Sequence, residues 1–168
     1  MPDLVICNTS PLFYLHRIRH LEILRQLYHQ LVVPEAVRDE LHVGQMQGED
    51  TPELEAYAWI IVRTVRVPEV IQLITDLGPG EAQVLALALE EPGSLVILDD
   101  GFARAVATAR GIRLTGTAGV LLKAKQEGHI HAVAPLLDTL RQQGFRLSDA
   151  TRAAIVALAQ EEPLPGGG

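Results

Sequence analysis

The sequence predicts an α/β fold of three layers, in which helices flank a central, mostly parallel sheet. Short apolar runs typical of buried strands alternate with longer stretches whose apolar residues recur at helical spacing. The run 95–98 holds four consecutive apolar residues, two of them β-branched, as expected for a strand buried on both faces of a parallel sheet. No repeat or linker divides the alternation, so we expect one domain.

Five strands are predicted, over residues 4–7, 31–33, 59–62, 95–98 and 112–114. Helical spacing predicts two helices within 12–27 that bend near Arg19, and one that Pro34 opens. Further helices are expected after Pro68, from Glu81, and over 102–110, 118–127, 132–143 and 148–160. Ser10 is the expected N-cap of the first helix and Ser148-Asp149 the cap of the last. Residues 44–52 are expected to form a flexible polar loop.

Burial and domain limits follow from the same pattern. The helix that starts at Glu81 has an apolar face made by four residues, Val84, Leu85, Ala88 and Leu89. Phe102 and Trp59 are expected in the core rather than as base-stacking platforms. We predict a domain over residues 1–147, a C-terminal helix over 148–162 packed on the same domain, and a disordered tail over 163–168.

Composition limits the classes of function. The formal net charge of −7, from 21 acidic residues against 14 lysines and arginines, argues against charge-driven binding to duplex nucleic acid. No apolar run approaches the ~20 residues that a membrane span requires, and no secretory leader is visible. The single cysteine, Cys7, is expected to be a buried, inert thiol in a reducing compartment, which together predict a cytoplasmic protein without membrane partners.

Acidic and amide side chains follow the predicted strands. Asp99 and Asp100 come directly after the strand at 95–98, and Asn8 follows the first strand. Because ligands of parallel sheets bind beyond the carboxyl ends of the strands, these residues are expected at one edge, where helices could add Glu40 and Glu81. An aspartate there can also simply cap the next helix, and a glutamate in a first turn is favoured by the helix dipole.

Oxygen ligands of this kind suit Mg²⁺ or Mn²⁺ rather than zinc. A divalent cation held there could neutralise a phosphate and lower the pKa of a bound water, which favours phosphodiester hydrolysis. Other chemistries fit less well. The pair His129 and His131 has no further His or Cys beside it, an Asp-x-Asp after the first strand is missing, and no Gly-x-x-x-x-Gly-Lys phosphate loop is present.

An ordered set of short motifs resembles a PIN domain over roughly residues 3–147. The set consists of Asn8-Thr9-Ser10-Pro11-Leu12, Val33-Pro34 with Glu40, Gly80-Glu81-Ala82, Leu98-Asp99-Asp100-Gly101-Phe102-Ala103-Arg104 and Thr115-Gly116-Thr117. It is most similar to a PIN-like branch of predicted nucleic-acid-binding proteins related to VapC-type toxins.

The resemblance implies a Mg²⁺- or Mn²⁺-dependent endoribonuclease that often self-associates as a homodimer. By position, Glu40, Glu81 and Asp99 match catalytic acids, and Asn8 and Asp100 complete the implied metal ligands. Ser10, Thr115 and Thr117 match supporting residues. Arg104, one turn after the acid pair, is the best candidate to bind substrate. RNA is the implied substrate, and an antitoxin protein is the implied partner if the chain is the toxin of a toxin–antitoxin pair.

The first motif departs from the family pattern, because Asn8 stands where the family usually has an aspartate. An amide oxygen can still bind a metal, but the site loses one negative charge. Two hypotheses therefore remain open. The first is an active metal-dependent ribonuclease, and the second is a catalytically silent PIN-like module that binds RNA or a protein. Whether Asp99 or Asp100 ligates is also left open.

Overall fold

The computed structural model describes residues 2–161. By its internal contacts the chain divides into two units, and the boundary along the sequence lies between Thr117 and Ala118. The first unit contains the sheet and the helices from α1 to α6, and the second contains the helices α7, α8 and α9. The predicted limits at 147 and 162 stay a prediction, and the predicted tail at 163–168 lies outside the described residues.

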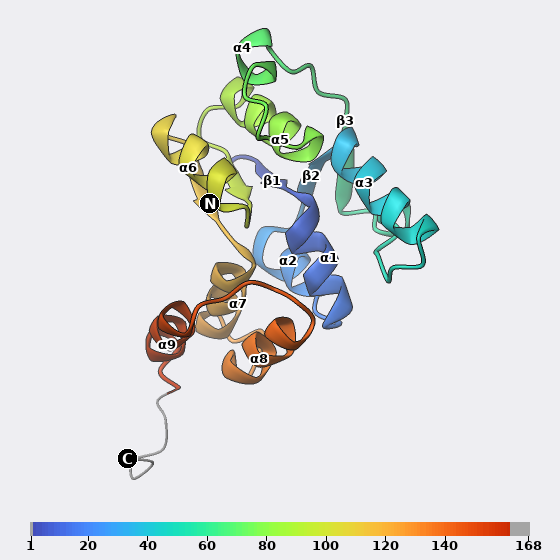
Figure 1. The fold of residues 1–168 in the computed structure, drawn as a ribbon. Helices are drawn as coiled ribbons and strands as arrows, with labels where there is room; N and C mark the ends of the chain where they lie inside the picture. The colour runs from blue at the N-terminus through green and yellow to red at the C-terminus, as the bar shows by residue number, and fades with distance from the viewer. Residues whose placement is uncertain (1, 162–168) are drawn as a thin grey trace. The chain divides into compact units, whose positions relative to one another are not determined.

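The sheet of the first unit is entirely parallel, with strand order β3-β2-β1-β4-β5 within the described residues. Strands β1, β2 and β3 of this sheet are labelled in Figure 1. Ile6 of β1 pairs with Val32 of β2 on one side and with Val96 of β4 on the other. The strands are β1 (Val5–Cys7), β2 (Leu31–Pro34), β3 (Ile60–Arg63), β4 (Leu95–Ile97) and β5 (Arg113–Thr115). From β1, the sheet therefore extends through β2 and β3 on one side and through β4 and β5 on the other. The boundary between β1 and β4 is the topological switch point of the sheet.

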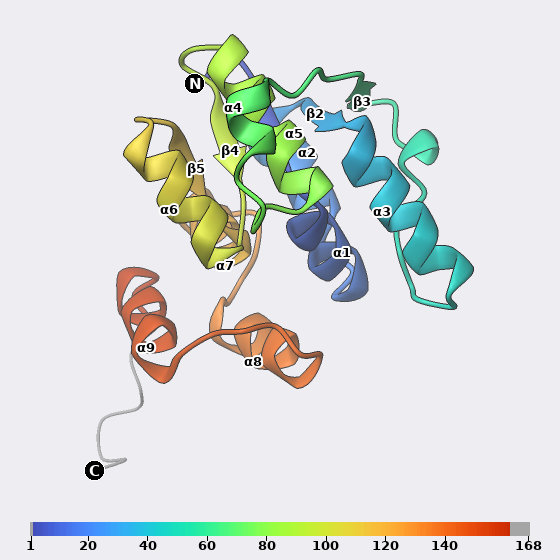
Figure 2. The ribbon, with the colours of Figure 1, turned by 45° about the horizontal axis from the view of Figure 1, so that its top comes forward.

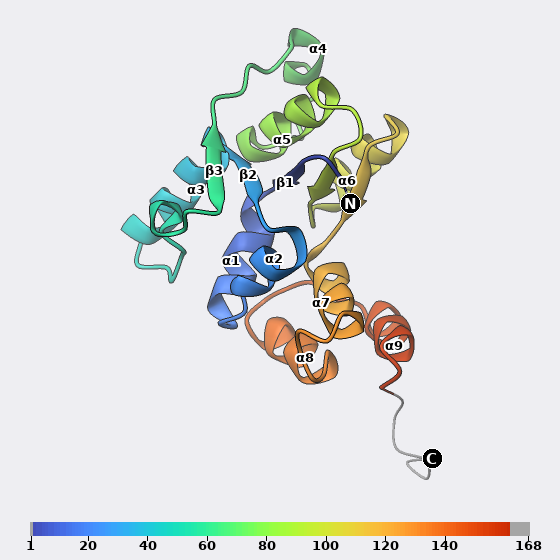
Figure 3. The same cartoon turned by 180° about the vertical axis from the view of Figure 1, so that it is seen from behind.

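Helices flank this sheet in the three-layer α/β arrangement that the sequence predicted (Figures 2 and 3). Helix α5 packs on β1, β2 and β4, and α6 packs beside β5. The helices of this unit are α1 (Thr9–Arg17), α2 (Glu22–Tyr28), α3 (Glu35–Met46), α4 (Glu69–Gln72), α5 (Pro79–Glu90) and α6 (Gly101–Ala109), with a short 3-10 turn at Leu54–Ala56. None of the helices within residues 2–161 is long and apolar enough to cross a membrane.

The core of the first unit lies between the sheet and its helices. Ile6, Val33 and Val96 of the central strands are fully buried, as continuous apolar strands of a parallel sheet should be. Val84, Leu85 and Ala88 of α5 are buried as predicted, but Leu89 is not: its side chain is 45% exposed. The prediction of a helix from Glu81 was correct within two residues, because α5 begins at Pro79.

The second unit consists of α7 (Thr117–Gln126, of which Thr117 belongs to the first unit), α8 (Ala134–Gln142) and α9 (Asp149–Leu158). Ser148 caps α9 as predicted, since its hydroxyl accepts the Thr151 N–H at 3.1 Å. Glu161 joins the three helices. Its carboxylate accepts the N–H groups of Val133 and Ala134 at the start of α8, at 2.7 and 3.1 Å, and the Lys125 ammonium of α7 at 3.2 Å.

Four local predictions were wrong. The N-cap of α1 is Asn8 rather than Ser10. The helix after Pro68 has only four residues, and α3 continues to Met46, so the polar loop starts later than predicted. Phe102 is 44% exposed instead of lying in the core, because the buried positions of α6 are Ala103 and Ala107.

Candidate functional site

The carboxyl ends of β1 and β4 place the predicted site residues beside one another. The Asn8 N–H donates to the Ile97 carbonyl at 3.0 Å, which extends the β1–β4 pairing by one residue past the strands. Asn8 is therefore next to the position where Asp99 and Asp100 leave β4. This is the edge of the sheet that the parallel arrangement predicts as the ligand-binding edge.

The Asp99 carboxylate is held by three hydrogen bonds from two other segments of the chain. Ser10 Oγ donates at 2.9 Å, Thr117 Oγ1 donates at 2.6 Å, and the Thr117 backbone N–H donates at 2.8 Å. Ser10 and Thr117, which the sequence predicted as supporting residues, thus both contact Asp99. The hydroxyl of Ser10 is used for Asp99, which explains why it does not cap α1.

Gly116 and Arg104 lie against the same carboxylate. A β-carbon at Gly116 would lie 2.8 Å from Asp99 Oδ1 and 2.9 Å from Arg104 Nη1, so this position has no room for a side chain. Arg104 is half-buried, and its Nη1 donates to the Leu98 carbonyl at 2.8 Å. The guanidinium is consequently fixed near Asp99 by the backbone.

Glu40 of α3 meets Asn8 across Gly80 of α5. Glu40 Oε1 accepts the Gly80 N–H at 2.9 Å, and Oε2 accepts the Thr9 hydroxyl. A β-carbon at Gly80 would lie 2.8 Å from both Glu40 oxygens and 3.1 Å from Asn8 Oδ1. Asn8 Oδ1 is buried and has no hydrogen-bond partner among the described residues, although buried polar atoms are normally paired.

Glu81 lies in the same acidic region and its pKa is raised. Burial is the main cause, and the negative charges of Glu40 and Asp100 raise the pKa further. Hydrogen bonds from its own backbone and from the Asn8 side chain act in the opposite direction without cancelling the effect. Three of the other predicted residues, Asn8, Glu40 and Asp100, therefore act on the Glu81 carboxyl.

Asp100 is the N-cap of α6. Its Oδ2 accepts the Ala103 N–H at 2.9 Å, and its side chain is otherwise exposed. Neighbouring Asp99 and Asp100 therefore differ: all the bonds of Asp99 fix it in place, whereas Asp100 caps a helix with one oxygen and contributes charge at Glu81. The alternative that an aspartate caps the next helix applies to Asp100.

Cys7 ends β1 below this site and is free and buried, as predicted. Burial, followed by the negative charge of Asp99, raises the pKa of its thiol well above the ordinary value. The thiol is therefore kept protonated, and it donates weakly to the Asn8 carbonyl at 3.5 Å.

The site residues found by sequence divide into two groups. Asn8, Glu40, Glu81 and Asp100 form one group, which we call the acid cluster, and Asp99 with Ser10, Thr117 and Arg104 forms the other. Thr115 makes no side-chain hydrogen bond among the described residues; its backbone carbonyl accepts the Leu98 N–H. Sequence reasoning missed two participants, Thr9 and the Gly80 N–H. Both stand in the quoted motifs, Asn8-Thr9-Ser10 and Gly80-Glu81.

Within residues 2–161, no three Asp, Glu, His or Cys side chains converge closely enough to hold a metal ion by themselves. His129 and His131 accordingly do not form such a group with other residues of that part of the chain. Any cation site at the acid cluster would depend on the amide oxygen of Asn8 as well as on carboxylates.

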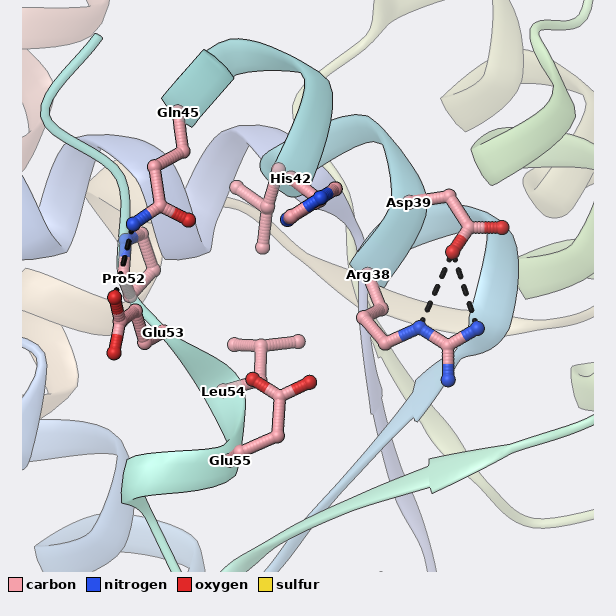
Figure 4. A pocket seen from close by; sticks show the side chains of 9 residues that line it. Arg38, Asp39, His42, Gln45, Pro52, Glu53, Leu54 and Glu55 are labelled. Atoms are coloured by element: carbon pink, nitrogen blue, oxygen red, sulfur yellow. Dashed lines mark hydrogen bonds and ion pairs between the residues drawn. The ribbon is translucent and has the colours of Figure 1, made fainter. Parts of the chain in front are cut away.

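Two hollows in the first unit lie away from the acid cluster. One, of about 290 Å³, is between the outer side of α3 and residues 52–55; its lining includes Arg38, Asp39, His42 and Glu53 (Figure 4). Arg38 and Asp39 pair with each other at 3.1 Å there. The other, of about 270 Å³, includes Leu89, Arg110 and Arg113 in its lining. Neither contains a residue predicted for the site.

The chain was compared with family models, curated proteins and solved structures. A family model described as a PIN domain matches residues 4–161. No curated protein and no solved structure matches the chain. The family match covers nearly the whole chain, including all the motifs in which the resemblance was found, and the parallel sheet with its acidic edge is the fold which that resemblance implies. The chain therefore belongs to the PIN-domain family.

Proposed function

We propose that the protein is a Mg²⁺- or Mn²⁺-dependent endoribonuclease whose metal site is the acid cluster. The observation that supports this most directly is the buried Asn8 Oδ1. It has no hydrogen-bond partner within residues 2–161, and it lies across Gly80 from the Glu40 carboxylate. An oxygen that gives up its hydration without a hydrogen bond costs free energy, which a cation at this position would recover.

The residues of the cluster fit a hard divalent cation. They provide only oxygen donors, from Asn8, Glu40, Glu81 and Asp100. Burial first, and then the negative charges of Glu40 and Asp100, raise the pKa of Glu81. When bound, a cation would neutralise the phosphate of the RNA and lower the pKa of a water molecule. Because the amide of Asn8 is neutral and the protein groups alone do not complete a site, water or substrate oxygens would have to supply further ligands.

The remaining residues would position these groups. The Thr9 hydroxyl and the Gly80 N–H fix the orientation of the Glu40 carboxylate. Thr117 and Ser10 fix Asp99. Arg104, held by the Leu98 carbonyl, retains further N–H groups with which it could bind a phosphate oxygen. That the protein acts as the toxin of a toxin–antitoxin pair and forms a homodimer belongs to the same proposal and rests on family membership alone. That it works in the cytoplasm is also proposed, on the ground of its single, free cysteine.

The test uses Asp100→Asn, because asparagine caps a helix as well as aspartate does while removing the charge from the cluster. We expect this variant to keep the stability of the wild type and to lose RNA cleavage with Mn²⁺. Asp39→Asn is the matched control: Asp39 is exposed on α3 beside Glu40 but lines the hollow of Figure 4 instead. Equal cleavage by wild type and Asp100→Asn would refute the role of Asp100, and no cleavage by any protein would refute the nuclease.

The alternative is a catalytically silent module that binds RNA or a protein. Asn8 supports it, since an amide replaces the expected carboxylate, and so do the three hydrogen bonds that already occupy most of the acceptor sites of Asp99. Asn8→Asp separates the two proposals. A gain of RNA cleavage by this variant over an inactive wild type supports the silent module, whereas an active wild type excludes it.

A further inference from the structure

Phe102 exposes its ring at the rim of the acid cluster. It is the second residue of α6, directly after the Asp100 cap and Gly101, and 44% of its surface is exposed. The helix turns its alanines, Ala103 and Ala107, toward the core, so the large ring stays in solvent. Full burial of such a side chain is worth roughly 1.5–3 kcal/mol, and the exposed 44% of Phe102 leaves part of that gain unused.

The surroundings of the ring suit one flat ligand better than a protein partner. Asp100 stands two residues before it and the half-buried Arg104 two residues after it, so its neighbours along the chain are charged rather than apolar. The other large apolar residues that are exposed in the described part of the chain belong to other elements: Val43, Met46, Ile61, Val70, Leu73, Leu89 and Leu158. A protein interface needs a contiguous apolar patch, and among the large apolar residues that are exposed within residues 2–161, α6 contributes only Phe102.

We propose that Phe102 is a binding site for one unpaired nucleobase of single-stranded RNA, adjacent to the phosphate that the acid cluster would act on. This inference rests on the proposed function and assigns a part of its substrate. Stacking also suits a chain of net charge −7. A base stacks on an aromatic ring through its π-face, whereas contacts to phosphates need a basic surface. A paired base has no free face, so the substrate would be unpaired there.

The experiment measures RNA binding without cleavage. The parent protein is Glu81→Gln, which lowers the charge of the cluster and should not cleave. Its affinity for a labelled, unstructured oligouridine is determined by fluorescence anisotropy. We expect Phe102→Ala to raise the Kd by about 5- to 150-fold, the range for loss of one stacked base, and Phe102→Trp to restore it. Leu89→Ala is the matched control, at 45% exposed and on another helix, and should leave the Kd unchanged.

A second ligand shows whether the loss comes from stacking. An abasic ribose-phosphate strand of the same length keeps the charge but lacks the bases, so Phe102→Ala should not weaken its binding further. The proposal is overturned if the parent does not bind oligouridine, if Phe102→Ala binds it as tightly as the parent, or if the abasic strand loses as much affinity. A change of sedimentation with Phe102→Ala would show a self-association surface instead.

Cleavage by the wild type is measured separately with Mn²⁺, so the two proposals can fail independently. If Phe102→Ala raises the Kd but the wild type does not cleave RNA, the stacking site is supported and the nuclease proposal is refuted. If the wild type cleaves RNA but Phe102→Ala leaves the Kd unchanged, the nuclease proposal is supported and the stacking site is refuted.

Discussion

Asp99 and Asp100 are adjacent in sequence but differ in what surrounds them. Asp99 accepts three hydrogen bonds from Ser10 and Thr117, which come from distant parts of the chain, while Asp100 caps α6 and acts on Glu81 through its charge. The sequence shows two carboxylates after a strand, but it does not show which residues approach each one. Which of the two carboxylates caps α6 therefore could not be decided from the sequence.

Thr117→Val tests the support of Asp99. Valine has the shape of threonine, so the variant removes only the 2.6 Å hydroxyl bond to the carboxylate and leaves the backbone N–H bond. Because Thr117 is fully buried, we expect a loss of about 1–3 kcal/mol in the free energy of unfolding and a fall in RNA cleavage of about 10–100-fold. Thr115→Val, whose hydroxyl has no described partner, should change neither quantity in urea denaturation and cleavage assays.

Glu81→Gln should stabilise the protein while it abolishes cleavage. The raised pKa means that the folded state favours the protonated glutamate. Its contribution to stability is therefore fully present below the ordinary pKa of 4.5 and is lost as the pH rises through the raised value. Glutamine does not ionise, so the advantage of the variant over wild type should be small at pH 4 and larger at pH 7 in urea denaturation.

The control for Glu81 is Glu90→Gln, at an exposed position of the same helix. It should change stability by less than about 0.5 kcal/mol and leave cleavage intact. An advantage of Glu81→Gln that does not grow between pH 4 and pH 7 would contradict the electrostatic explanation.

At the scale of elements, helical and strand periodicity predicted most of the fold. The predicted strand limits are correct within one or two residues. Runs such as Val96-Ile97 are buried on both faces of the sheet, and strands of this kind consist of consecutive apolar residues, which the sequence shows directly. The errors arise where a side chain has a distant partner. Ser10 was assigned to α1 as a cap by local rules, but its hydroxyl bonds to Asp99, 89 residues away.

The first turn of α5 depends on a glycine that sequence reasoning quoted only as part of a motif. Gly80→Ala would add a β-carbon 2.8 Å from both Glu40 oxygens. We expect it to displace Glu40, to lower RNA cleavage by at least tenfold and to reduce stability. Gly101→Ala, in the first turn of α6, has no heavy atom within 4 Å of the new β-carbon and should leave stability unchanged or raise it by about 0.5–1 kcal/mol. Thermal unfolding and cleavage of both variants check this pair.

At the scale of the molecule, the alternation of strands and helices predicted a parallel sheet but not its order. The order β3-β2-β1-β4-β5 depends on which strands pair across long connections, and Val5 pairs with Leu95, 90 residues later. Glu40 of α3, Glu81 of α5, the Asn8 amide after β1 and Asp100 after β4 are brought together by this order. The cluster was therefore predicted only through the general rule for parallel sheets and through the resemblance to a known family.

Divalent cations should stabilise the native state if the acid cluster binds them. A ligand that binds only the folded protein adds about 2.7 kcal/mol at a concentration 100 times its Kd. We expect Mn²⁺ to raise the unfolding midpoint of the wild type at pH 7, and to do so much less for Glu40→Gln, which lacks the carboxylate beside Asn8. Identical shifts in the two proteins, measured by calorimetry, would place the cation elsewhere.

The position of Glu161 has a practical consequence for shortened versions of the protein. This single carboxylate, from beyond α9, holds the start of α8 and the Lys125 ammonium of α7. A chain that stops after Glu161 retains these bonds, whereas one that stops a residue earlier leaves two N–H groups of α8 without their acceptor. We expect that one-residue difference to lower stability by about 0.5–2 kcal/mol, and urea denaturation of the two truncated proteins measures it.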